Sequence, residues 1–213
     1  MTACSNMMET ASIMKDAPDL NARIAERVRA LRAARRLSLD ALAGKSGVSR
    51  SMISLIERGE TSPTAVVLDK PAAGLGVPLP TLFEGVDANG EAKSAGGPLA
   101  RLADQPQWRD PASGYVRRKV SPPGAPQPMQ IVEVRFPPGR RVAFENPARD
   151  LRIHQQVWVL DGSIDVTVGR QRHRLQRGDC LAMQLDRPTA FHNPTRRTAR
   201  YAVVIASEPV PGR

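Results

Sequence analysis

Cysteine is scarce in this chain of 213 residues, and no long apolar run occurs. Only Cys4 and Cys180 are present, which argues against a structural disulfide and fits a reducing cytoplasm. Because no stretch of about 18 apolar residues exists, we expect no membrane span. The opening MTACSNMMETASIMKD lacks a basic segment followed by an apolar one, so we expect a loose tail rather than a secretory signal.

The short motifs of common enzymes are absent as well. The sequence holds no GxSxG, P-loop, HExxH or CxxC pattern, so it names no catalytic residue, and we expect a protein that is not an enzyme. Cys180 follows a Gly-Asp turn on an expected strand. We expect it to be a small buried apolar residue rather than a redox sensor.

The net charge is strongly positive, at +10, and it is unevenly distributed. Residues 18–84 hold ten basic and seven acidic side chains, a net +3, whereas residues 91–213 hold twenty and eleven, a net +9. A basic balance suits a nucleic-acid partner through its phosphates. A solvated basic surface gives the same numbers, so composition alone leaves both interpretations open.

Residues 38–60, SLDALAGKSGVSRSMISLIERGE, have the layout of a helix-turn-helix. The pattern predicts a short helix over about 39–45, a turn at 46–48, and a second helix over about 49–57. Gly47 suits the left-handed backbone conformation that such a turn often needs. Apolar residues recur at the spacing that faces a shared core, which leaves the polar side of the second helix outside.

This stretch resembles the phage-repressor-like (XRE, or Cro/C1-type) helix-turn-helix family, and the resemblance extends from Leu20 to about Phe83. It implies a sequence-specific transcriptional regulator whose second helix enters the major groove of double-stranded DNA. We expect base contacts from that helix and phosphate contacts from the residues around it. The expected DNA-binding residues are Ser38, Lys45, Ser49, Arg50, Ser51, Ser54, Arg58 and Thr61.

Three more helices would complete a five-helix domain. They are expected over residues 20–36, over a stretch capped by Ser62, and over residues 79–83. Pro71 falls inside the second of these, where an interior proline removes a hydrogen bond at a cost of roughly 3 kcal/mol. Either the helix kinks at Pro71 or the domain is less stable than its relatives.

From Gly114 onward, short apolar or alternating runs are separated by Pro and Gly turns, which predicts an all-β barrel or sandwich. The expected strands are 115–120, 129–136, 156–160, 164–168, 171–175, 180–184 and 200–206. The segment WVLDGSIDVTVGRQRHRLQRGDCLAM resembles the small barrel of the cupin family, and the resemblance covers about residues 126–206.

The fold class expected is therefore α+β in two domains: an N-terminal five-helix, all-α helix-turn-helix domain and a C-terminal all-β, jelly-roll-like cupin barrel. The expected boundaries are 1–17 for the tail, 18–84 for the helix-turn-helix domain, 85–105 for a linker and 106–213 for the barrel.

Many cupins hold a metal ion with three His and one Glu. Aligned on VLDG and on the Gly-Asp turn, the resemblance assigns four positions to these ligands. They are occupied by Arg149, Leu151, Gln155 and Thr189. None of these is a strong metal ligand, and the three His are out of register, since a one-residue slip turns a side chain to the other face of a strand. We expect no metal and no cofactor.

A barrel mouth that is mostly apolar with a few polar groups remains, and this is the usual form of a small-molecule site. The expected effector-binding residues are Arg149, Gln155, Val157, Met183, Thr189 and Phe191. Arg149 would suit an anionic effector. A filled interior without a ligand is the alternative.

These observations predict a cytoplasmic transcriptional regulator that binds a pseudo-palindromic operator as a homodimer. Its barrel would sense a small-molecule effector, dimerise the protein, or both. Two alternatives stay open. One is a metal-dependent cupin enzyme, of dioxygenase or isomerase type, fused to a DNA-binding domain. The other is an antitoxin-like protein whose barrel binds another protein.

Overall fold

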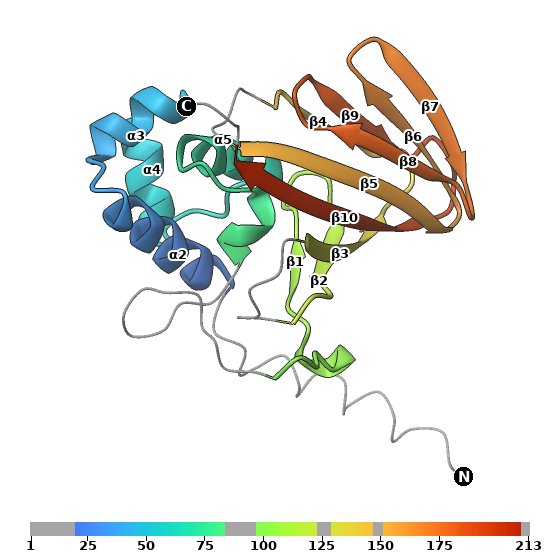
Figure 1. Ribbon diagram of the computed structural model, residues 1–213, viewed down its shortest axis with the longest axis horizontal. Helices are drawn as coiled ribbons and strands as arrows, with labels where there is room; N and C mark the ends of the chain where they lie inside the picture. Colours follow the sequence, from blue (N-terminus) through green and yellow to red (C-terminus); the bar gives the residue numbers. More distant parts are fainter. Residues whose placement is uncertain (1–19, 84–96, 123–128, 147–150, 210–213) are drawn as a thin grey trace.

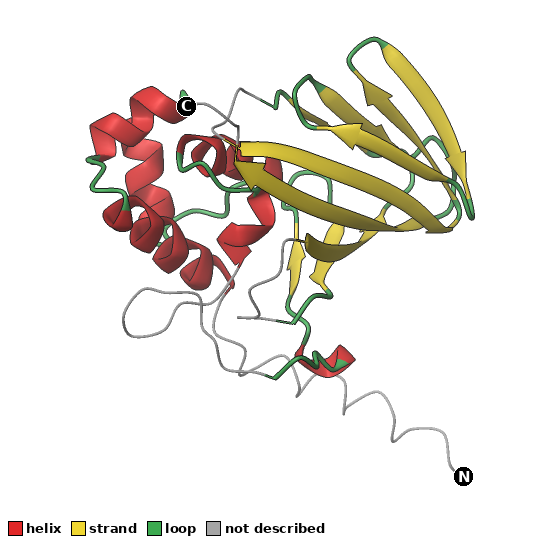
Figure 2. Cartoon of the chain, viewed as in Figure 1, coloured by secondary structure: helices red, strands yellow, loops and turns green. Residues whose placement is uncertain are grey.

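The computed structural model describes residues 20–83, 97–122, 129–146 and 151–209 (Figure 1). The α-helices gather on one side of the molecule and the strands on the other (Figure 2). We call residues 20–83 the helical domain and residues 107–209 the β-domain. No helix in the described ranges is both long enough and apolar enough to cross a membrane.

The helical domain contains four described α-helices and one 3-10 helix. They are α2 (Leu20–Ala34), α3 (Leu39–Ser46), α4 (Arg50–Glu57), α5 (Ala65–Gly74) and η1 (Leu79–Phe83). The expected count of five α-helices is not confirmed, because residues 79–83 form the tighter 3-10 turn. The helices share one core of fully buried side chains, among them Val28, Leu42, Ile53 and Leu68.

The local signals of the helix-turn-helix are confirmed. Ser38 Oγ accepts a hydrogen bond from the Ala41 amide at 3.0 Å, and Ser49 Oγ accepts one from the Met52 amide at 3.2 Å. Gly47 has φ = 67°, the left-handed conformation in which a Cβ is strained. The caps and the glycine therefore fix where α3 ends and where α4 begins.

The expected cap of α5 was wrong by two residues. Thr64, not Ser62, has the extended backbone of an N-cap, and its hydroxyl accepts from the Val67 amide at 3.2 Å. Ser62 instead accepts a hydrogen bond from Asn21 at 3.0 Å, which ties the loop to the start of α2.

Pro71 does not end the fourth helix. α5 continues through it to Gly74, and the proline ring is buried. Since proline has no N–H, the Val67 carbonyl receives no helical hydrogen bond from residue 71. The defect expected from the sequence therefore lies inside an otherwise regular helix.

The β-domain consists of two antiparallel sheets. One sheet has the order β1 (Gln107–Arg109), β2 (Val116–Lys119), β3 (Met129–Phe136), β10 (Ala199–Pro209), β5 (Leu151–Asp161) and β8 (Cys180–Gln184). The other has the order β4 (Arg141–Phe144), β9 (Thr189–His192), β6 (Ser163–Val168) and β7 (Gln171–Gln176). The strands form two separate sheets, so the closed barrel is not confirmed, while an all-β domain of the kind that the cupin resemblance implies is present.

Side chains of β5 alternate between the two faces of the six-stranded sheet. Along β5, Ile153, Gln155, Val157 and Val159 are buried and the residues between them are more exposed. Cys180 pairs with Trp158 on the outer face of the edge strand β8 and is exposed, so the expectation of a buried cysteine was wrong. The inner faces of the two sheets supply the core.

The two domains pack directly on each other. The Ala65 amide, at the start of α5, donates a hydrogen bond to Asp110 Oδ1 of the β-domain at 2.8 Å. Asp110 is buried, and its other oxygen accepts from the amide and the hydroxyl of Ser113, each at 2.7 Å. A carboxylate of the β-domain thus stabilises the positive end of α5.

A chain of ring contacts continues this interface into the β-domain. Centroids of successive rings lie 5.2 to 6.4 Å apart. In order, the rings belong to Phe83, Trp108, Tyr115, Phe136, Tyr201, Phe191 and Phe144. Phe83 is the last residue of η1, so the aromatic chain starts in the helical domain and ends inside the sandwich.

Candidate functional site

The outer face of α4 carries the polar side chains expected to read DNA. Ile53 and Ile56 are buried against the domain core, whereas Arg50, Ser51 and Arg58 are exposed. Ser54 is half-buried on the same outer side. The helix is therefore anchored by one face and presents the other face to solvent, as a recognition helix must.

Arg50 is oriented by an acidic neighbour on α3. Its Nε lies 3.4 Å from Asp40 Oδ1, and the two side chains are 66% and 76% exposed. An ion pair this exposed contributes little to stability and is easily broken. Asp40 can therefore hold the guanidinium near the first turn of α4 without preventing its transfer to a DNA base.

Arg58 lies at the other end of the same face. It donates hydrogen bonds to Ser54 Oγ at 2.5 Å and to Glu60 Oε2 at 2.7 Å. The hydrogen bond from Arg58 lowers the pKa of Glu60. Arg58 is held by two short hydrogen bonds, whereas Arg50 has a single contact of 3.4 Å with Asp40, so Arg50 is the better candidate for a base contact.

The remaining expected DNA contacts surround α4. Ser38 and Lys45 are exposed near the two ends of α3, and Thr61 is half-buried in the loop that follows α4. Ser49 Oγ lies 3.1 Å from Ser51 Oγ and also caps α4, so its hydroxyl is largely committed to the protein. All eight expected residues are described, and their contacts with DNA stay predictions.

A buried ion pair that the sequence reasoning missed holds α4 in place. Arg32 of α2 contacts Glu57, the last residue of α4, through two bonds of 2.6 and 2.7 Å, and its third nitrogen donates to the Leu37 carbonyl at 2.9 Å. Glu57 is only 8% exposed, and its hydrogen bond with Arg32 raises the pKa of that guanidinium. Glu57 follows Ile53 by four residues, so helical spacing placed it on the inner face.

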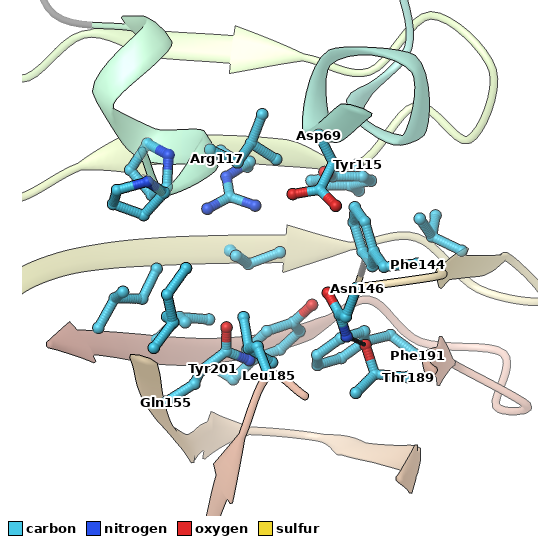
Figure 3. A pocket seen from close by; sticks show the side chains of 18 of the residues that line it. Asp69, Tyr115, Arg117, Phe144, Asn146, Gln155, Leu185, Thr189, Phe191 and Tyr201 are labelled. Atoms are coloured by element: carbon cyan, nitrogen blue, oxygen red, sulfur yellow. Dashed lines mark hydrogen bonds between the residues drawn. The ribbon is translucent and has the colours of Figure 1, made fainter. Parts of the chain in front are cut away.

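A cavity lies inside the β-sandwich, at the end that faces the helical domain (Figure 3). Inside the cavity, a volume of about 60 Å³ is open to the centre of a water molecule. A single water needs roughly 10–15 Å³ by the same measure, so the cavity has room for a small organic molecule. Most of its wall is apolar or aromatic, including Phe136, Phe144, Ile153 and Leu185.

Three of the expected effector residues line this cavity: Gln155, Thr189 and Phe191. Val157 and Met183 are buried in the β-domain but are not part of its wall. Arg149 lies outside the described residues. The role of all six in binding an effector stays a prediction.

Two charged residues of the cavity wall were not anticipated. Asp69 of α5 is buried, and Arg117 of β2 is half-buried beside Tyr115. Burial raises the pKa of Tyr115 to about 12, so its hydroxyl stays protonated. Alternation along the expected strand 115–120 could have found Arg117, because it shares a face with Tyr115 two residues earlier. Nothing in the sequence could place Asp69 here, since that depends on how the domains pack.

The other polar groups of the wall differ in how they are satisfied. Asn146 donates to Thr189 Oγ1 at 3.0 Å and to the Arg187 carbonyl at 2.9 Å. Gln155 has no hydrogen bond to its side-chain amide within the described ranges, although it is only 7% exposed. Its amide is therefore one polar group of this wall that is open to a ligand.

The geometry offers little to a metal ion. Nowhere in the described ranges do three or more His, Cys, Asp or Glu side chains gather closely enough to hold one. His154 lies on the outer face, 3.2 Å from Glu208, and His192 lies 3.8 Å from Asp165 on the other sheet. A metal-free β-domain stays a prediction.

Comparison with known proteins bears on the helical domain first. Residues 28–82 match the family model described as Helix-turn-helix. The HTH-type transcriptional regulator DdrOP3 of Deinococcus deserti (strain DSM 17065 / CIP 109153 / LMG 22923 / VCD115) is 37% identical over 92 residues, 43% of this chain and 69% of DdrOP3.

Two similarities extend over both domains. The HTH-type transcriptional regulator SutR of Escherichia coli (strain K12) is 27% identical over 176 residues, 82% of this chain and 89% of SutR. The crystal structure of an HTH_3 family transcriptional regulator from Vibrio cholerae superposes with a TM-score of 0.70 at 27% identity, covering 90% of this chain and 98% of that one. The motif geometry and these similarities agree, and the chain belongs to the XRE-type helix-turn-helix family of transcriptional regulators.

Proposed function

We propose that this protein binds a pseudo-palindromic operator as a homodimer, reads bases through α4, and changes its DNA affinity when a small molecule enters the β-domain. The observation that carries this proposal is the outer face of α4, which is polar and exposed while its inner face is anchored in the core. A protein that regulates chromosomal genes in this way acts in the cytoplasm, and it needs no catalytic activity of its own.

Arg50→Ala is the direct test of base reading. Arg to guanine is the commonest specific contact in the major groove, and Arg50 lies at the first turn of α4. We expect a loss of about 1–3 kcal/mol on the cognate operator and a relaxed preference at one base position, measured by titration of an operator library. Lys45→Ala is the matched control, since a phosphate contact should weaken binding to all sequences alike and lower the salt slope by about one unit.

Two outcomes would contradict this assignment. Equal binding of the wild type and Arg50→Ala to the cognate operator would remove Arg50 from the reading surface. A changed base preference in Lys45→Ala, with an unchanged salt slope, would show that Lys45 rather than Arg50 contacts a base.

The outer face of the six-stranded sheet supports the homodimer. Trp158 and Met129 are 50% and 49% exposed, and the strand register brings Ile131, Val204 and Ala202 between them. A second copy of the chain is the occupant that fits, because one helix-turn-helix reads only one half-site and the operator needs two.

Replacement of Trp158 tests this interface. We expect Trp158→Asp to shift the protein from dimer to monomer in sedimentation velocity and to weaken operator binding at least tenfold. Leu102→Asp is the control, because Leu102 is an apolar side chain that is 67% exposed on η2, away from the sheet. Unchanged sedimentation of Trp158→Asp would place the dimer interface elsewhere.

The cavity supports the sensing role. Its wall is mostly apolar with a few polar groups, the usual composition of a small-molecule site. A ligand that binds only the folded state raises the melting temperature by mass action, so a metabolite screen that monitors unfolding is the first experiment. Stoichiometric iron, manganese or zinc in protein purified without added metal would favour the cupin-enzyme alternative instead.

A further inference from the structure

The cavity is closed by the DNA-binding domain itself. Three of its wall residues, Pro78, Leu79 and Pro80, come from the segment around η1, and a fourth, Asp69, comes from α5. The rest of the wall belongs to the β-domain and includes Arg117. A ligand in this cavity would touch both domains at once, which a ligand held within the β-domain alone would not do.

Arg117 lacks the partner that a half-buried guanidinium normally has. In the described parts of the chain it forms no ion pair with a carboxylate, and it lies beside the buried Tyr115 hydroxyl, which has no hydrogen bond of standard geometry. A charge among apolar side chains is costly unless it is paired. A carboxylate is the group that suits the guanidinium, because it accepts two parallel hydrogen bonds.

Asp69 supplies the opposite charge from the other domain. Its carboxylate and the Arg117 guanidinium point into the same end of the cavity (Figure 3). Asp69 already has an interaction within the protein, and a carboxylate, with about four acceptor positions, can accept from a ligand's N–H groups as well. A simple anion would meet repulsion from Asp69, and a simple cation would meet repulsion from Arg117.

The rest of the wall specifies an apolar body. Phe191 and Leu185 lie on the side of the cavity away from the two charges, and Gln155 adds one polar group there. Phe144 lines the wall as well. We propose that the ligand is a small zwitterion of the α-amino acid type with an apolar side chain. Arg117 binds its carboxylate, Asp69 binds its ammonium group, and the aromatic wall holds its side chain. This proposal rests on the proposed sensing function and adds the ligand's chemical class.

The same geometry explains how the ligand acts on DNA binding. α5 is pressed against α3, since a Cβ on Gly74 would lie 3.1 Å from Leu42 Cδ1 and from Ser46 Cβ. A ligand that binds Asp69 therefore holds the helix on which the helix-turn-helix packs. We expect the ligand to change operator affinity by about 5- to 150-fold, the usual range of coupling between two sites.

A matched ligand series tests the class. Calorimetric titration of the full-length protein would compare leucine with 4-methylpentanoate and 3-methylbutylamine, and phenylalanine with 3-phenylpropionate and 2-phenylethylamine. We expect at least one of the two amino acids to bind at least tenfold more tightly than either of its truncated analogues, because each analogue lacks the group of opposite charge for one of the two wall residues, Asp69 or Arg117.

Isosteric variants assign the two contacts. Asp69→Asn should remove the preference for the amino acid over its carboxylate analogue, which lacks the ammonium group. Arg117→Gln should remove the preference for the amino acid over its amine analogue, which lacks the carboxylate. Asp104→Asn and Arg135→Gln are controls, because both side chains are exposed outside the cavity, and they should keep both preferences. If a variant fails to fold, the ligand series on the wild type still decides whether the ligand is a zwitterion.

The outcomes separate this inference from the sensing function. Equal or tighter binding of a truncated analogue by the wild type would overturn the zwitterion while supporting a sensor. Binding of none of the six compounds would also overturn it, and a hit from the metabolite screen would then preserve the sensing role. Loss of both preferences in the control variants would overturn the assignment to Asp69 and Arg117.

Discussion

In the helical domain, the residues expected to contact DNA lie between Ser38 and Thr61, on two helices and the loops that flank them. The cavity wall instead gathers residues from Asp69 of the helical domain to Ile205 of the β-domain, and no two neighbouring strands supply it alone. A reading surface can be built from one continuous segment because a helix displays its polar face wherever its apolar face is anchored. A cavity needs at least two layers, so its residues come together only when distant segments pack.

The two regions also differ in how charge is used. Arg50 and Arg58 are exposed, and their acidic neighbours are exposed as well, so water screens these pairs. Arg32, Glu57 and Asp110 are mostly buried, and their partners are fixed at 2.6 to 2.9 Å. The exposed charges are available to a partner, whereas the buried charges hold the surfaces in position. Two substitutions test this difference, and a third tests the interior proline of α5.

Glu57→Gln should have the largest effect. It leaves the Arg32 guanidinium partly buried without its anion, and breaking a buried pair typically costs about 3–5 kcal/mol. We expect the helical domain to unfold at a much lower denaturant concentration, as followed by circular dichroism. Glu60→Gln is the control, because its pair with Arg58 is exposed and should change stability little. Equal effects of the two substitutions would erase the distinction between buried and exposed pairs.

Asp110→Ala should come next. It removes the acceptor of three hydrogen bonds, of which one, from the Ala65 amide of α5, joins the domains. A hydrogen bond to a charged group contributes about 1.5–3 kcal/mol, and the two groups of Ser113 can bind water instead. We expect the free energy of unfolding to fall by about 2–3 kcal/mol. In calorimetry we expect two unfolding transitions in place of one, because the hydrogen bond that joins the domains is lost. A single transition at an unchanged temperature would show that Asp110 does not couple the domains.

Pro71→Leu should have the smallest effect and the opposite sign. Leucine restores the N–H that the Val67 carbonyl lacks, while α5 already passes through this position as a helix. We expect a gain of about 1–3 kcal/mol in unfolding free energy, close to the penalty of an interior proline. A lower melting temperature would mean that the buried space around residue 71 is too small for leucine.

Sequence patterns predicted the two helices of the helix-turn-helix almost residue by residue. Caps, the turn glycine and apolar spacing are local signals, and they gave α3 and α4 to within one residue at each end. The misplaced cap of α5 has a local cause too, because Ser62 and Thr64 both precede a helix start and only the fold selects Thr64. The ion pair between Arg32 and Glu57 joins two helices and was not visible in either one.

The β-domain was predicted in outline. Long alternating runs gave β3 and β8 at their true bounds, whereas β1, β4 and β9 are three or four residues long and carry too few alternations to stand out. The strand register confirmed that Gln155 faces inward, which sequence alternation had implied. Asp69 and the residues around η1 could not be assigned to the cavity, because their place in it depends on domain docking.

The chain of ring contacts has an optical consequence. It includes seven of the eight aromatic side chains, and Trp158 is the one left out. Trp108 is buried where the domains meet, while Trp158 is half in water on the outer sheet face. In the monomer, the two indoles should therefore emit at different wavelengths, and only Trp158 should be quenched by iodide. The protein carries one natural fluorescent reporter for the contact between its domains and another for the face on which a second copy would pack.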